Sequence, residues 1–241
     1  MKIIEPSFEI LLLANPDQIL KHIERCARKC YQSEHRITED SAPKFIRKLI
    51  DIGHESTIEH ISVTVDVICD RGITHEVVRH RLCSFSQEST RYVNYSKDKF
   101  GKEITVIKPF FFDPEEEGKD IALPEFLDIS MPKTYKLNSF DIWFITCQFA
   151  EWGYNTLINE FQAKPQEARS VLPNSTKTAI AITANLREWR HIFKLRCSQA
   201  AHPQMRQIML PLLEEMKNKI PIIFNDYYEQ YKTSINQLKE K

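Results

Sequence analysis

Alternating apolar and polar residues mark two strands in this chain. Residues Ile61 to Val67 alternate over seven positions, and a second alternating run covers Thr176 to Thr183. Because successive side chains of a strand point to opposite faces, this alternation predicts strands with one face buried. The mostly apolar run from Phe8 to Leu13 predicts a further strand near the N-terminus. Half-buried strands of this kind are typical of a mainly antiparallel sheet.

Helical spacing and capping residues predict three helices in the first two thirds of the chain. Residues 15–29 begin with Asn as a cap and Pro at the first helical position. Ser41 caps a second helix, which carries apolar residues at helical spacing and ends near Gly53. Residues Ser139 to Phe161 predict a long third helix.

The C-terminal third predicts further helices. Pro203, Pro211 and Pro221 cut it into pieces, because proline has no N–H to donate within a helix. We expect the polar tail over residues 232–241 to fray. Together these elements predict the α+β class, with helices packed on a mainly antiparallel sheet in a single domain over residues 1–231.

The composition fits a compact enzyme that binds small anions. With 241 residues, of which 42% are hydrophobic, the chain can bury a sizeable core. It has 5 glycines and neither a Gly-x-Gly-x-x-Gly nor a Gly-Lys-Ser/Thr loop, so any dinucleotide must be held by other means. The 33 basic and 33 acidic residues cancel, whereas proteins that bind nucleic-acid phosphates usually have a basic excess.

The cysteines and the hydropathy pattern bear on the compartment. The 6 cysteines are scattered without a Cys-x-x-Cys pair, so they indicate neither a disulfide framework nor a zinc ribbon. The sequence shows no signal peptide and no apolar run long enough to span a bilayer. We therefore expect a cytoplasmic protein with reduced cysteines and no membrane partner.

The segment from Arg79 to Tyr92 packs cations, hydroxyls and an amide into one short stretch. Its Arg-His-Arg triplet supplies two guanidinium forks and a titratable imidazole, and three serines add neutral hydrogen bonds. If residues 73–82 are helical, Arg79 lies about 160° around the helix from Arg81. Three side chains that fan out so widely cannot converge on one small ligand. Either the helix ends here, or the triplet serves two ligands, for example across a subunit contact.

A second geometric pattern concerns a later helix. An apolar stripe at i, i+3 and i+7 within Leu186–Phe193 continues to Arg196, which should therefore face inward. An arginine on a buried face needs an anionic or strongly polar partner. This partner is either a carboxylate of the protein itself or a bound ligand. Arg187 and Arg190 are expected to look outward.

The pattern Arg-His-Arg, seven residues, Ser and then Arg-Tyr at residues 79–92 resembles the signature of the flavin-dependent thymidylate synthases. Three further blocks are similar to segments of that family: Gly-His-Glu-Ser-Thr-Ile-Glu-His at residues 53–60, Arg-Ser-Val-Leu-Pro at 169–173 and Asn-Leu-Arg at 185–187. The resemblance covers most of the chain, in ordered blocks from residue 27 to residue 207.

This resemblance implies an activity, cofactors and partners. The reaction is the reductive methylation of deoxyuridylate (dUMP) to thymidylate (dTMP), a methyltransferase reaction. Methylenetetrahydrofolate gives the carbon, NADPH reduces FAD, and the reduced flavin supplies the electrons that turn methylene into methyl. Members of the family are homotetramers with active sites assembled from several subunits. The expected partners are therefore dUMP, folate and further copies of the chain, without nucleic acid.

The resemblance also implies roles for matched residues. Flavin contacts are expected at Ser56, Glu59, Arg79, His80, Arg81, Ser86, Asn185, Arg187 and His191. Nucleotide contacts are expected at Glu76, Gln87, Ser89, Arg91, Arg169 and Arg196. Two of these are the expected catalytic residues. Arg196 would stabilise negative charge that develops on the uracil ring, and Ser89 would bind and orient the nucleotide, since no base that could activate its hydroxyl is identifiable.

Several positions depart from the commonest family pattern. Glu76 stands where glutamine is common, and a carboxylate there would repel a phosphorylated nucleotide unless it is protonated or turned away. Cys30 stands in place of a frequent serine, and Ser86 and His191 stand in place of frequent asparagines. The spacing of His202 differs from that of the family, which leaves its role in flavin binding open.

Other readings of the same residues remain. His54 and His60 are six residues apart, which does not place them on one helical face, so we expect no metal site. Ser56 to Glu59 also fits a capping box. Cys83 could be taken for a nucleophile, but the flavin chemistry does not demand one. The alternative functions are a nucleic-acid-binding protein that uses the basic segment Arg79–Arg91, and a flavin-binding relative that has lost synthase activity.

Overall fold

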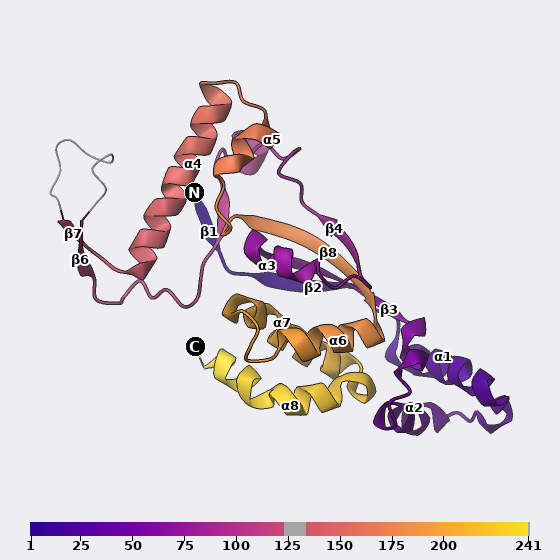
Figure 1. Ribbon diagram of the computed structural model, residues 1–241. Coiled ribbons are helices and arrows are strands. Elements are labelled where there is room, and N and C mark those ends of the chain that lie inside the picture. The colour runs from indigo at the N-terminus through magenta and orange to yellow at the C-terminus, as the bar shows by residue number, and fades with distance from the viewer. Residues whose placement is uncertain (123–133, 241) are drawn as a thin grey trace. The chain divides into compact units, whose positions relative to one another are not determined.

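The computed structural model describes residues 1–122 and 134–240 (Figure 1). The α-helices in this part of the chain are α1 (Pro16–Arg28), α2 (Ser41–Asp51), α3 (Arg71–Val77), α4 (Ser139–Asn159), α5 (Pro165–Ala168), α6 (Leu186–Arg196), α7 (Pro203–Lys219) and α8 (Pro221–Lys239). The strands are β1 (Lys2–Ile4), β2 (Ser7–Leu12), β3 (Ser62–Asp70), β4 (Ser84–Gln87), β5 (Thr105–Ile107), β6 (Lys119–Ala122), β7 (Thr134–Leu137) and β8 (Lys177–Asn185). Short 3-10 helices are η1 (Lys29–Tyr31), η2 (Glu34–Arg36), η3 (Glu55–His60), η4 (Asp98–Phe100) and η6 (Arg169–Val171).

The chain divides into two compact units. The smaller unit contains Met1–Glu5, Asp70–Gly72 and Glu88–Thr178, and the larger unit contains Pro6–Cys69, Ile73–Gln87 and Ala179–Lys241. The boundary between a domain over residues 1–231 and a separate tail stays a prediction.

A four-stranded sheet in the order β2-β3-β8-β4 forms the centre of the larger unit. The pairs β2–β3 and β4–β8 are antiparallel, so the α+β class with a mainly antiparallel sheet is confirmed. Buried and partly exposed residues alternate along β3 and β8, the two strands that alternation predicted. Figure 1 shows α6, α7 and α8 together beside this sheet, and these helices pack on one another. Their apolar faces and the sheet share one core.

The first two helices lie close to their predicted bounds. Asn15 caps α1, because its side-chain oxygen accepts hydrogen bonds from the backbone N–H groups of Asp17 and Gln18. Ser41, however, is the first helical residue of α2 and not its cap. Gly53 follows α2 with a φ of 76°, a left-handed conformation that glycine adopts without steric cost.

Two predictions about the C-terminal third were wrong. Pro211 lies inside α7, which continues through it to Lys219. A proline there removes one helical hydrogen bond, but the neighbouring Leu210, Leu212 and Leu213 are fully buried, and their burial outweighs that loss. The expected frayed tail is also helical as far as Lys239, because α8 buries Ile235 in the core.

The smaller unit has its own core around the long helix α4. The side chains of Trp143, Cys147 and Tyr154 on α4 pack with Ile104 and Val106. Strand β1 pairs with β5 in parallel, and β6 pairs with β7 in antiparallel. The smaller unit also contains the segment that follows β4, which carries Ser89 and Arg91, and the 3-10 helix η6, which carries Arg169.

Candidate active site

Arg196, at the C-terminal end of α6, is the centre of a polar cluster in the larger unit. Its Nη1 donates to the Glu76 carboxylate at 2.9 Å, its Nη2 to the Glu76 backbone oxygen at 2.9 Å, and its Nε to His80 Nε2 at 3.0 Å. The Arg196 side chain is 19% exposed. Arg196 therefore faces inward, as the apolar stripe predicted. One of its partners is the Glu76 carboxylate, so the internal ion pair that the sequence allowed is present.

His80 is held as a neutral imidazole. Burial, together with the nearby charges of Arg196 and His191, lowers its pKa to about 4. Because Arg196 Nε can only donate, His80 Nε2 must accept, and the ring proton then sits on Nδ1, 3.3 Å from a carboxylate oxygen of Glu188. The Glu188 carboxylate therefore faces a neutral ring, and burial raises the pKa of Glu188.

The helix that precedes the Arg-His-Arg triplet ends before it. Helix α3 stops at Val77, so the first of the two explanations for the fanned triplet applies. Of the three side chains, His80 is buried, while Arg79 and Arg81 are exposed. The structure brings His80 to Arg196 and leaves the two arginines at the surface, open to ligands.

A cavity of about 530 Å³ lies next to this cluster. Four of the predicted flavin contacts line it, namely Glu59, Asn185, Arg187 and His191. Arg187 Nη1 donates to the Glu59 carboxylate at 2.5 Å, and the ring of His191 meets that of His80 edge-on at 5.8 Å. Asn185 caps α6 by accepting a hydrogen bond from the Glu188 N–H at 2.8 Å. Half of the Arg187 side chain is exposed, as predicted.

A second cavity, of about 780 Å³, shares Arg187 with the first. Basic side chains from three segments line it, among them Arg28, Arg36 and Lys48. Ser56, a predicted flavin contact, lies there beside Thr57. Cationic and hydroxyl groups are suited to a ligand that carries phosphate groups.

Arg190 does not look outward as predicted. Only 4% of it is exposed, and its guanidinium binds both oxygens of Asp226, at 2.8 and 2.7 Å, as well as Glu55 and the backbone oxygen of Ile223. Burial of the Asp226 carboxyl opposes ionisation, but the bonds from Arg190 hold its pKa below the usual value. Arg190 therefore ties α6 to α8 and to the segment that begins η3.

The predicted capping box at Ser56 to Glu59 does not form. These residues belong to the 3-10 helix η3, whose cap position is His54 without a side-chain hydrogen bond. Glu59 binds Arg187 instead. His202 caps α7, since its Nδ1 accepts a hydrogen bond from the Gln204 N–H at 3.3 Å.

Strand β4 carries two further predicted contacts. Ser86 is exposed, and Gln87 Nε2 donates to Thr74 Oγ1 at 3.0 Å. Cys83, just before the strand, is a poor nucleophile, because burial raises the pKa of its thiol to about 12.

In the smaller unit, three predicted nucleotide contacts lie around one turn. Ser89 Oγ accepts a hydrogen bond from the Arg91 N–H at 3.3 Å, and the Arg91 guanidinium lies over the Tyr92 ring at 5.5 Å. Arg169, from η6, donates to Thr90 Oγ1 at 3.4 Å. Arg91 and Arg169 are both exposed.

Sequence reasoning missed Glu188, whose carboxylate lies 3.3 Å from Nδ1 of the buried His80. Its spacing from Asn185, three residues after a helix cap, was a signal for its place in the first turn of α6 but not for its partner. Within the described residues, His80, Glu188 and His191 also form a group with possible metal ligands within 4.8 Å of one another. Both ring nitrogens of His80 already face Arg196 and Glu188, so we assign no metal to it.

None of the helices in residues 1–122 and 134–240 is long and apolar enough to cross a membrane.

The fold as a whole matches solved structures. One is the crystal structure of the flavin-dependent thymidylate synthase ThyX from Helicobacter pylori complexed with FAD and dUMP, with a TM-score of 0.67 and 19% identity over 91% of this chain and 98% of that chain. Another is the UMP/dUMP methylase PolB from Streptomyces cacaoi bound with 5-Br UMP, with a TM-score of 0.68 and 18% identity over 96% of this chain and 97% of that chain. At these identities the likeness shows a shared α+β fold.

Sequence comparison identifies the family. The family model described as "Thymidylate synthase complementing protein" matches residues 11–222. The flavin-dependent thymidylate synthase of Corynebacterium efficiens is 31% identical over 208 residues, which cover 85% of this chain and 78% of that protein. The enzyme of the same name from Mycobacterium tuberculosis is 33% identical over the same shares. The chain belongs to the flavin-dependent thymidylate synthase family.

Proposed function

We propose that this protein converts dUMP to dTMP by reductive methylation, with methylenetetrahydrofolate as carbon donor and NADPH as reductant through FAD. Family membership supports the reaction, and the solved relative from Helicobacter pylori is described as a complex with FAD and dUMP. The comparisons give no support to the alternative of a nucleic-acid-binding protein.

The observation that carries the proposal is the Arg196 cluster. A cation that is 81% buried and fixed by three hydrogen bonds can act on charge in a substrate without further reorganisation. We assign Arg196 to the stabilisation of negative charge that develops on the pyrimidine. Because Glu76 is paired with Arg196, its carboxylate is compensated, which reduces the repulsion of a nucleotide phosphate.

The donor set of the two cavities fits FAD. Cationic and hydroxyl side chains line the larger cavity and would hold the diphosphate, while Glu59, Asn185 and His191 line the smaller one. When bound, FAD supplies the electrons that reduce the transferred methylene to methyl. The role of the protein is to orient the ligands, with flavin contacts at the nine residues assigned above.

The nucleotide contacts would be Glu76, Gln87, Ser89, Arg91, Arg169 and Arg196. Exposed guanidinium groups such as those of Arg91 and Arg169 suit the nucleotide phosphate, and Ser89 would orient it. We further propose a cytoplasmic homotetramer with active sites at subunit interfaces, which takes dUMP and a folate as substrates and binds neither nucleic acid nor membranes.

The test is the visible absorption spectrum of the dialysed protein reconstituted with FAD, recorded before and after addition of dUMP. A retained flavin band that shifts with dUMP, followed by dTMP formation with NADPH and methylenetetrahydrofolate, is expected. Because one solved relative is named as a UMP/dUMP methylase, UMP belongs in the same assay as a competing substrate. Loss of all flavin on dialysis would contradict the proposal.

A further inference from the structure

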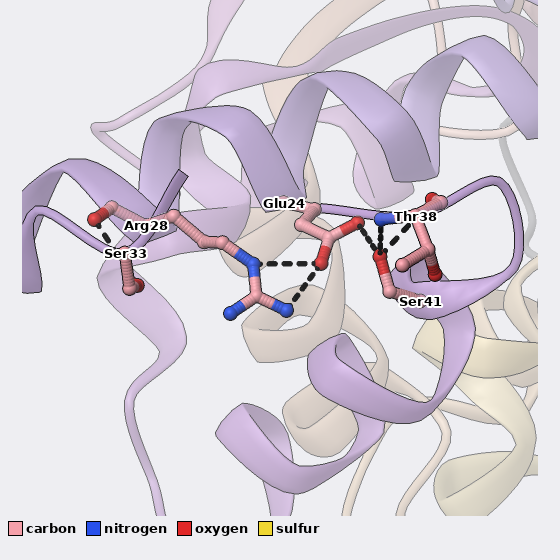
Figure 2. Close-up of polar contacts among 5 residues, drawn as sticks. All are labelled: Glu24, Arg28, Ser33, Thr38 and Ser41. Carbon is pink, nitrogen blue, oxygen red and sulfur yellow. Dashed lines mark hydrogen bonds and ion pairs between the residues drawn. The ribbon is translucent and has the colours of Figure 1, made fainter. Parts of the chain in front are cut away.

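A buried ion pair lies at the end of α1, outside the residues assigned above. Arg28 Nε and Nη2 both donate to one carboxylate oxygen of Glu24, at 2.8 and 2.7 Å (Figure 2). Only 1% of Glu24 and 8% of Arg28 are exposed. The face of the guanidinium stacks on Phe45, with 4.2 Å from Cζ to the ring centre.

The second oxygen of Glu24 is also fixed. Ser41, the first residue of α2, donates its hydroxyl proton to it at 2.8 Å, a shorter contact than the 3.1 Å from the same hydroxyl to the Thr38 carbonyl oxygen. The Ser41 hydroxyl in turn accepts a hydrogen bond from the Thr38 N–H at 2.9 Å, as Figure 2 shows. Glu24 therefore cannot rotate without breaking contacts on both sides, and Arg28 is held in one orientation.

Stability alone gives little reason for this pair. Well-packed apolar residues often replace a buried ion pair without loss of stability, since removing two charges from water is costly. The pair does fix a planar donor group, and the remaining terminal nitrogen, Nη1, has no hydrogen-bond acceptor among the described residues. Arg28 lines the larger cavity together with Phe45.

We propose that Arg28 binds the diphosphate of FAD through its Nη1 edge, and that Glu24 and Ser41 are positioning residues that aim this edge into the cavity. The inference rests on the proposed function. Arg187 lines both cavities, so an elongated ligand such as a flavin dinucleotide can occupy the two together. Its diphosphate would then lie in the larger cavity, where Arg28, Arg36 and Lys48 provide the positive charge.

The experiment is a titration of the full chain with FAD at low and at high salt. Quenching of the flavin fluorescence measures the affinity. Arg28→Met is expected to weaken FAD binding about tenfold to a hundredfold, the usual size for a charge-assisted hydrogen bond, and to reduce its salt dependence. Ser41→Ala, which frees Glu24 but keeps every charge, is expected to weaken FAD binding about threefold with the native salt dependence. Affinity for dUMP at saturating FAD should stay native in both variants.

Arg25→Met is the matched control, because Arg25 lies on the same helix but is exposed, and it should bind FAD as the native chain does. Native FAD affinity in Arg28→Met would overturn the assignment. If that variant fails to fold, native affinity in Ser41→Ala would overturn the positioning role. An equal loss of dUMP and FAD affinity would mean that the pair only supports the fold. A native chain that binds no FAD would overturn the proposed function as well, whereas native binding in chain and variants alike would overturn this inference alone.

Discussion

At the scale of single residues, Arg196 has the strongest claim to a role in the reaction. Its three hydrogen bonds to Glu76 and His80 fix the guanidinium before any ligand binds. We expect Arg196→Ala to retain FAD but to lose about a hundredfold to a thousandfold in turnover, the usual cost of removing one preorganised electrostatic group. Flavin absorption and dTMP formation measure the two effects separately.

The exposed Arg25 offers the matched control, and Arg25→Ala should keep native turnover. A fully active Arg196→Ala would show that Arg196 serves the fold only.

The lowered pKa of His80 predicts a pH-dependent stability. Its pKa is about 4 in the folded chain against 6.5 for an ordinary histidine, so the unfolded chain binds the proton more readily between these values. The contribution is fully present above pH 6.5 and is lost as the pH falls towards 4. It amounts to about 3 kcal/mol, from 1.36 kcal/mol per pKa unit.

Urea unfolding between pH 4 and 7 tests this, with His80→Gln expected to show a flatter pH dependence than the native chain. Glu188, whose raised pKa acts in the opposite direction, is present in both chains and cancels in the comparison. His75→Gln, at an exposed position on α3, should leave the native slope unchanged. Equal slopes for the native chain and His80→Gln would contradict the assignment.

Periodicity found Arg196 but failed for its neighbour Arg190. The apolar stripe of α6 continues to Arg196, so periodicity alone predicts that this side chain faces inward, whichever group it binds. Arg190 is buried because Glu55 and Asp226 surround it, and these partners lie 135 and 36 residues away in the sequence. No local pattern carries information about such distant partners, whereas the ordered family blocks do carry information about matched site residues.

At the scale of elements, the helical tail makes a stability prediction. Ile235 on α8 is 1% exposed and belongs to the main core. Ile235→Ala is therefore expected to lower the free energy of unfolding by about 2–5 kcal/mol, from lost burial and the cavity that remains. Asn236→Ala, at the adjacent exposed position, should change it by less than about 0.5 kcal/mol. Urea titration of the native chain and both variants measures these changes. If Ile235→Ala is as stable as the native chain, the tail is frayed, as the sequence predicted.

The helices and strands that were predicted correctly have a clear pattern in their own residues. β3 and β8 are nine residues long each and alternate over all or most of their length, and α1 carries its cap and its proline. β1, with three residues, is too short for any pattern, and it exists because β5 pairs with it. The helix through Pro211 likewise depends on tertiary burial, which overrides the local preference against proline.

At the scale of the whole molecule, exposed apolar side chains on α4 indicate an interface. Ile142, Phe149 and Trp152 recur at i, i+7 and i+10 and are 43%, 48% and 66% exposed, so they form one uncovered face of the helix. Such a face is stable in water when another protein surface covers it. In the homotetramer that we propose, the partner is a further copy of the same chain.

We therefore expect a mass of about 114 kDa in solution, four times the 28.4 kDa of one chain, measured by light scattering. The double variant Phe149→Lys and Trp152→Lys should fall to a smaller assembly, because two charges cannot be buried without partners. Phe149→Leu with Trp152→Phe keeps the face apolar and should keep the native mass. If the lysine variant also keeps it, the α4 face is not the contact, and a mass of one chain for the native protein would refute the tetramer itself.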